Sequence, residues 1–123
     1  MTGAPLPPGW PREVRPPGSP DWERTALDWL LDLCPPDYRG YAVLRRHPLA
    51  LARLAAHHVE GGRQACAAAL GSLRADLSGD LDARTLAEVF DVLDAEQARL
   101  LAASRAVTLV EDALRGRKYI PRL

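Results

Sequence analysis

Apolar residues recur at steps of three and four positions along two long stretches of the chain, as they do in amphipathic helices with one buried edge. The first stretch is expected to run from Pro48 to about Leu77, with an apolar edge of Leu51, Ala55, Val59, Gly62, Cys66, Leu70, Leu73 and Leu77. The second begins after Asp82, with an edge of Leu86, Val89, Leu93, Glu96, Leu100, Ala103, Val107, Val110 and Leu114.

Each stretch contains a point at which the helix could break. Gly61 and Gly62 together cost about 2 kcal/mol of helix propensity relative to alanine. The apolar edge keeps its phase across the pair, however, so we expect one continuous helix. In the second stretch, Asp94 followed by Gln97 resembles a capping box, and a kink or restart there is the alternative to a straight helix.

The residues between the two stretches predict how they are connected. Ser78 and Gly79 are typical of a helix end, and Asp82 is a suitable N-cap for the next helix. Because this connection is short, the helices must run antiparallel as a hairpin with a coiled-coil-like seam. Gly116 marks the expected end of the second helix.

A further helix is predicted ahead of the hairpin, with Ser19 as its N-cap and Pro20 at its first position. Pro35 and Pro36 end it, and a short helix between Asp37 and His47 is a weaker expectation. No alternating strand pattern occurs. The sequence thus predicts an all-α fold, a three- to four-helix bundle in which one end of the hairpin is covered by the apolar stripe Trp22, Ala26, Trp29, Leu30 and Leu33.

Residues 1–19 are rich in proline and glycine, which exclude regular helix and central strand. We expect three parts: a proline-rich arm (1–19), a helical domain (20–116) and a basic tail (117–123). Trp10 is expected to fold back onto the bundle, since an exposed indole is costly. The alternative is that the arm is a docking peptide for another protein.

The chain has 123 residues, with 16 basic and 16 acidic side chains. Zero net charge argues against non-specific binding to nucleic acid. No charge-free apolar run is long enough for a membrane span, and no signal-peptide core is evident, so a cytoplasmic protein is expected. Cys34 and Cys66 are expected to be buried, reduced thiols.

Little in the sequence indicates catalysis. His57 and Glu60 have helical metal-ligand spacing, but no second pair accompanies them, so no metal site is predicted. Catalytic signatures such as GxSxG, HExxH, CxxC and glycine-rich phosphate loops do not occur. We therefore expect no enzyme activity, no catalytic residue and no cofactor.

Two groups of residues are candidate binding sites. Positive charge at the start of the first long helix, with tyrosines nearby, favours a small anionic ligand, bound by Tyr38, Tyr41, Arg45, Arg46 and His47. Pairing of the arginines with Asp32 or Asp37 is the simpler alternative. Contact with a protein partner or a second copy of the chain is expected from Trp10, Gly61, Gly62, Arg117 and Lys118.

Four stretches, PPGWP (7–11), WLLDLCPPDYRGY (29–41), VLRRHP (43–48) and LVEDALRG (109–116), resemble a family of small actinobacterial helical proteins with no assigned activity. The resemblance implies a bacterial protein and assigns no role to any residue. The resulting hypothesis is a non-enzymatic interaction module, a small adaptor or accessory subunit that self-associates through helix faces. The alternative is a binding protein or enzyme for a small anionic ligand.

Overall fold

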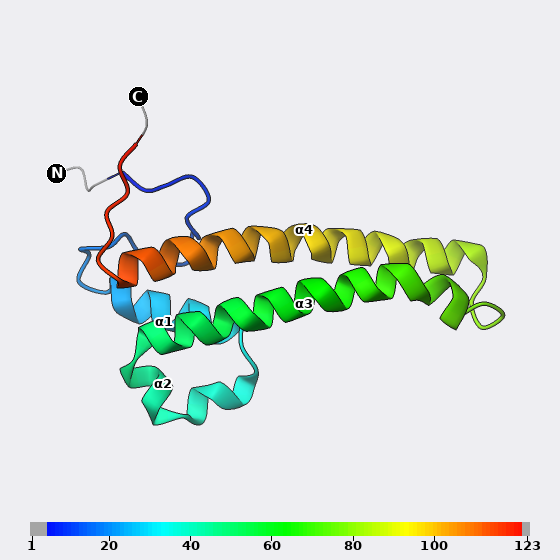
Figure 1. Cartoon of the computed structure of the whole chain (residues 1–123), viewed down its shortest axis with the longest axis horizontal. Helices are drawn as coiled ribbons and strands as arrows, with labels where there is room; N and C mark the ends of the chain where they lie inside the picture. Colours follow the sequence, from blue (N-terminus) through cyan, green and yellow to red (C-terminus); the bar gives the residue numbers. More distant parts are fainter. Residues whose placement is uncertain (1–4, 122–123) are drawn as a thin grey trace.

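The computed structural model describes residues 5–121 and consists of helices joined by turns (Figure 1). Within this range no strand forms, and the one bridge, between Ser78 and Leu81, lies in a turn. The all-α prediction is therefore confirmed. The elements in chain order are α1 (Trp22–Asp32), the 3-10 helix η1 (Pro36–Gly40), α2 (Ala42–Arg46), α3 (Pro48–Asp76) and α4 (Ala83–Leu114).

The two long helices, α3 and α4, form the antiparallel hairpin (Figure 1). α3 is continuous across the glycine pair, as predicted, and α4 continues through Asp94 without restarting. A Cβ atom at Gly62 would lie 3.3 Å from Leu100 Cδ1, so a leucine of the facing helix fills the space above this glycine. Close packing across the seam thus compensates for the low helix propensity of glycine.

The end of α3 and the start of α4 are set by the residues that the sequence analysis identified. Gly79 has a φ of 88°, a left-handed conformation that glycine adopts without steric cost. The Asp82 carboxylate then accepts a hydrogen bond from the Thr85 backbone N–H at 2.7 Å and caps α4. The predicted connection between the long helices is confirmed.

α1 begins two residues later than predicted. The expected N-cap, Ser19, lies in a turn in which its carbonyl accepts a hydrogen bond from the Trp22 N–H at 3.2 Å. Pro20 is in the same turn and is not helical. Asp21 occupies the N-cap position without a side-chain capping bond. The predicted start was wrong because a backbone turn, rather than a serine hydroxyl, starts this helix.

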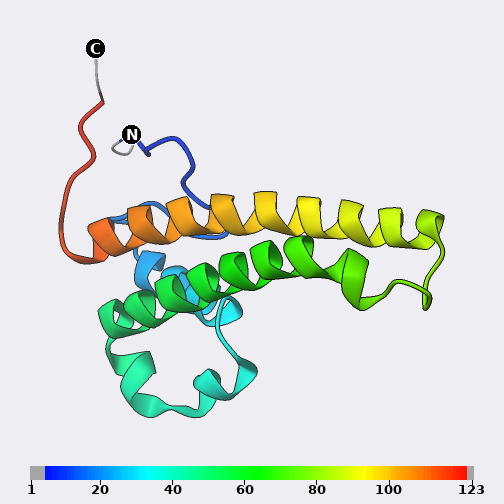
Figure 2. The ribbon, with the colours of Figure 1, turned by 45° about the vertical axis from the view of Figure 1, so that its right-hand side comes forward.

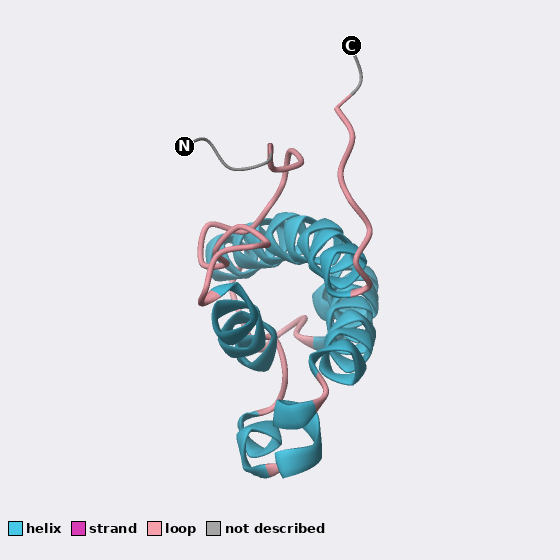
Figure 3. Ribbon diagram, turned by 90° about the vertical axis from the view of Figure 1, so that its left-hand side faces the viewer, coloured by secondary structure: helices cyan, strands magenta, loops and turns pink. Residues whose placement is uncertain are grey.

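The prediction of a single short helix between Asp37 and His47 also needs correction. The chain forms η1 and then α2, separated by Tyr41 in an extended conformation. Leu44 of α2 is buried and anchors this small pair of helices on α3. η1 and α2 lie below the hairpin when it is viewed from its end (Figure 3).

The proline-rich arm folds back onto the helices, as predicted for Trp10. The Trp10 indole N–H donates to the Val14 carbonyl at 2.8 Å, and its ring packs against the core. Val14 is itself buried, and the arm approaches α4 closely enough that a Cβ at Gly9 would lie 3.7 Å from Leu109. The arm is therefore part of the packed end of the molecule.

Candidate functional site

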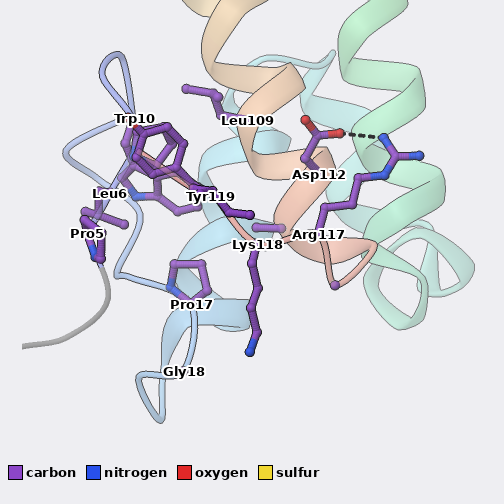
Figure 4. Close-up of a pocket in the computed structure, with 14 residues that line it drawn as sticks. Pro5, Leu6, Trp10, Pro17, Gly18, Leu109, Asp112, Arg117, Lys118 and Tyr119 are labelled. Atoms are coloured by element: carbon purple, nitrogen blue, oxygen red, sulfur yellow. Dashed lines mark hydrogen bonds and ion pairs between the residues drawn. The ribbon is translucent and has the colours of Figure 1, made fainter. Parts of the chain in front are cut away.

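Three of the five residues predicted for partner binding come together in one place. Trp10, Arg117 and Lys118 line a groove of about 640 Å³ at the C-terminal end of α4 (Figure 4). The arm forms one side of the groove, residues 116–120 form another, and Leu109 of α4 also lines it. Since Trp10 and Arg117 lie far apart in the sequence, only the folded-back arm brings them together.

The groove is mostly apolar. Leu6, Tyr119 and Ile120 keep 39%, 41% and 81% of their surface exposed. Arg117 Nη1 donates to Asp112 Oδ1 at 2.8 Å, whereas Lys118 forms no ion pair with any residue of the described range. Such a groove suits an apolar group, with one free ammonium at its edge.

The residues predicted to bind an anion lie around η1 and α2. The Tyr38 and Tyr41 rings are 5.8 Å apart, and Tyr41, Arg45, Arg46 and His47 are exposed. Within residues 5–121, neither Arg45 nor Arg46 forms an ion pair. Asp32, one of their expected partners, contacts Arg39 instead.

Sequence reasoning missed one member of this cluster, His58. The Tyr38 hydroxyl and His58 Nε2 are 2.8 Å apart, and the two rings meet edge to face. The contact spans twenty residues and exists because η1 and α2 form a compact pair that α2 anchors on α3. The hydroxyl of Tyr38 is thus already engaged within the protein.

The other candidate groups have internal roles. Cys34 and Cys66 are buried free thiols, as predicted. Burial raises the pKa of the Cys34 thiol, and Arg39 only partly opposes this shift, so a reactive thiolate is disfavoured. Glu60 accepts a hydrogen bond from Arg63 Nη1 at 3.1 Å, and this arginine occupies the carboxylate that was considered as a partner of His57.

The burial of side chains changes abruptly along the hairpin. Among residues 63–99, only Cys66 and Leu86 are buried. The core lies at the other end, where α1 packs on α3. Figures 1 and 2 show that α3 and α4 continue beyond α1 as a pair without a third helix. We call this part, residues 63–99, the distal hairpin.

One face of α4 illustrates the change. Positions at steps of three and four share a helix face, and this face contains Val110, Ala106, Ala103, Arg99, Glu96 and Val92. Val110 is fully buried and Ala106 is 5% exposed, whereas Val92 is 67% exposed. The same helix face is therefore covered at one end of α4 and open at the other, and the Glu96–Arg99 ion pair lies between the two ends.

The seam between α3 and α4 has two sides, and the Val92 face of α4 lies on one of them. Two contacts between the helices mark the other side, so the face of α3 that lies beside Val92 can be assigned by exclusion. Arg53 Nη1 donates to Glu111 at 2.8 Å, and the Arg74 guanidinium lies 4.9 Å from the Phe90 ring centroid. The positions of α3 that lie on the other side of the seam are small: Ala65, Ala69 and Ser72. Together with the Val92 face of α4 they form what we call the open face. Gly62 lies in the seam itself, against Leu100, and so is not available to a partner in the way predicted.

The tip of the hairpin has its own partial protection. Leu70, Leu73, Leu77, Val89, Phe90 and Leu93 are half-buried by one another across the seam. Arg74 covers one side of Phe90 through a cation–π contact. The open face has no comparable cover within the described residues.

No protein-family model matches the chain, and neither a curated protein nor a solved structure matches it. Within residues 5–121, no helix combines the length and apolar character needed to cross a bilayer.

Proposed function

We propose that this protein is a non-enzymatic interaction module, a small adaptor or accessory subunit, which pairs with a second copy through the open face of the distal hairpin. The observation that carries the proposal is the exposure of Val92 on a helix face that is buried at Ala106 and Val110. What supports the proposal is the combination of this exposed valine with the small side chains of α3 beside it, where a second helix can pack closely.

A second copy is the partner that this surface fits best. Two antiparallel helices form half of a four-helix bundle, so two hairpins laid face to face complete one. Small side chains at Ala65 and Ala69 allow a neighbouring helix to approach closely. With 16 basic and 16 acidic side chains, two copies carry no net repulsion.

Sedimentation equilibrium tests the proposal directly. We expect a monomer–dimer equilibrium at micromolar concentrations, shifted at least tenfold toward monomer by Val92→Glu, because a carboxylate at the interface would be desolvated. Ala98→Glu is the matched control, since it adds the same charge to an exposed position on another face of α4. A wild-type protein that stays monomeric at high micromolar concentration would refute self-association.

The competing hypothesis, an anion site formed by Tyr38, Tyr41, Arg45, Arg46 and His47, has one observation in its favour: the two arginines have no carboxylate partner within residues 5–121. Thermal unfolding with millimolar inorganic phosphate separates the two hypotheses. We expect no change in Tm, because these side chains are spread over an exposed surface. A rise in Tm that Arg46→Ala abolishes would favour the anion site.

A further inference from the structure

The groove at the C-terminal end of α4 has the size of a small-molecule site. Its volume of about 640 Å³ lies within the range of about 300–1,000 Å³ that is typical of small-ligand pockets. Three segments line it: the arm, residues 116–120, and α4 with Leu109 and Ala113 (Figure 4). A small ligand there would contact the protein on several sides.

Most of the lining is apolar. Trp10 and Tyr119 contribute an indole and a phenol ring, and Leu6, Leu109 and Ile120 contribute aliphatic side chains. Much of this surface is in contact with water, since Leu6, Tyr119 and Ile120 are all exposed. Covering it with an apolar group is favourable, because apolar surface is then removed from water.

The groove also carries one unbalanced positive charge. Its described lining contains two cations, Arg117 and Lys118, and one carboxylate, Asp112, a net charge of +1. Arg117 Nη1 donates to Asp112 Oδ1 at 2.8 Å, so these two groups neutralise each other. Lys118 forms no ion pair within residues 5–121, and Figure 4 shows its ammonium well apart from the Trp10 ring.

We propose that this groove binds a small organic anion of the medium-chain carboxylate class. The apolar chain lies against Trp10 and Leu109, and the carboxylate pairs with the Lys118 ammonium. The charge favours a monoanion, because a single cation in the lining lacks a partner. The apolar lining favours a ligand with a hydrocarbon body over a wholly polar anion such as inorganic phosphate.

This site is separate from the surface of the proposed function. The groove lies at the C-terminal end of α4, whereas Val92 is in the N-terminal half of that helix. Ligand binding can therefore be measured in the Val92→Glu variant as well as in wild-type protein. Failure of one proposal leaves the other standing.

A series of chain lengths tests the apolar part of the site. In calorimetric titrations of wild-type protein, we expect saturable binding of decanoate below about 1 mM. From hexanoate to octanoate to decanoate, Kd should fall about threefold or more at each step, since an open groove buries part of each added methylene. The absence of saturable decanoate binding, or one Kd for the whole series, would overturn the proposal.

Ile120→Ser removes an aliphatic side chain from the groove lining. Because Ile120 is 81% exposed, the fold does not depend on it, and the Kd for decanoate should rise about threefold. Val43→Ser is the matched control, since Val43 is 52% exposed in α2 and does not line the groove. Equal effects of the two substitutions would place the hydrocarbon chain elsewhere and overturn the assignment.

The headgroup is tested by comparing octanoate with 1-octanol. Lys118→Gln should raise the Kd for octanoate about three- to fivefold and leave that for 1-octanol unchanged, because one exposed ion pair contributes modestly. Arg105→Gln is the control, since it removes an exposed positive charge from α4 outside the groove. Equal wild-type affinity for the two probes, or equal effects of the two substitutions, would overturn the role of Lys118.

Nuclear magnetic resonance of ¹⁵N-labelled protein locates the ligand. Decanoate should shift the Trp10 indole N–H and the backbone amides of residues 116–120, and leave those of residues 83–93 unchanged. Shifts confined to other parts of the chain would overturn the site. Shifts of the groove residues with rising protein concentration alone would show that a second copy occupies the groove, which also overturns the proposal.

Discussion

Gly61 and Gly62 are adjacent residues in different environments. A Cβ at Gly61 would meet no atom within 4 Å, whereas a Cβ at Gly62 would lie 3.3 Å from Leu100 Cδ1. Both glycines are helical, so alanine at either position gains helix propensity. The difference between the two positions is therefore the space available.

This difference gives a prediction for stability. Gly61→Ala should raise the unfolding free energy by about 1 kcal/mol, because it adds helix propensity without a clash. Gly62→Ala should gain clearly less, since Leu100 is buried and has little room to move. Urea unfolding at low protein concentration measures both variants. Equal gains would contradict the close packing of Gly62 on Leu100.

Glu111 links the two long helices and should make stability depend on pH. Its side chain is 13% exposed. Its carboxylate oxygens lie 2.8 Å from Arg53 Nη1 and 3.3 Å from Arg115 Nε. Burial alone would raise the pKa of Glu111, but hydrogen bonds from the two arginines outweigh it and lower the pKa. Because the folded-state pKa is depressed, this stabilisation is present above the ordinary value of 4.5 and lost as pH falls through the folded-state pKa.

Glu111→Gln should accordingly lower the unfolding free energy at pH 7 by about 1 kcal/mol. The loss is limited to this size because half of the Arg53 side chain is exposed, so solvent screens its attraction to Glu111. The deficit should shrink as the wild-type carboxylate becomes protonated in acid. Glu88→Gln, an exposed carboxylate 4.0 Å from Arg84, serves as the control and should change little. A deficit that is the same in acid and at neutral pH would exclude the carboxylate charge as its cause.

At the scale of the element, the N-terminus of α4 depends on one side chain. The Asp82 carboxylate accepts a hydrogen bond from Thr85 N–H, and this bond lowers the pKa of Asp82. Asp82→Ala should lower Tm by a few degrees because the first turn of α4 loses its cap. Asp82→Asn retains an acceptor oxygen and should recover most of the loss. Equal losses of Tm in the Asp82→Asn and Asp82→Ala variants would show that loss of the capping hydrogen bond is not the cause.

The accuracy of the predicted helix boundaries follows from where their determinants lie. Gly79, Asp82 and Gly116 act through their own torsions or side chains, so the sequence alone indicated these boundaries. The start of α1 and the break at Tyr41 depend on backbone hydrogen bonds in turns, such as that from Trp22 N–H to the Ser19 carbonyl. Residue types at these turns do not specify that choice.

The candidate sites were less predictable because they depend on how elements pack. Trp10 and Lys118 were recognised separately, but their shared groove requires the arm and the C-terminal segment to meet on α4. His58 contacts Tyr38 only because η1 is held near α3 by its neighbour α2. On the hairpin, Gly61 and Gly62 were predicted as partner contacts, whereas Val92, on which the proposed pairing rests, lies outside the predicted apolar edge of its helix.

At the scale of the whole molecule, the one-sided core predicts a gradient of local stability. The fully buried side chains Leu30, Leu51 and Val110 lie where three helices meet, while the distal hairpin rests on a two-helix seam. Backbone amides near few buried contacts open at lower free energy. In dilute protein, amide hydrogen exchange should therefore be slowest in residues 51–59 and 103–110 and fastest in residues 70–77 and 83–93.

Protein concentration should change this gradient in a specific way. If a second copy covers the open face, exchange in the distal hairpin should slow as concentration rises through the dimer Kd, while the three-helix end stays unchanged. Val92→Glu should hold the distal hairpin at its dilute rate at every concentration. In dilute wild-type protein, the distal hairpin could instead exchange as slowly as the three-helix end. That result would show that the two-helix section is stable alone and would remove the stability argument for pairing through the open face.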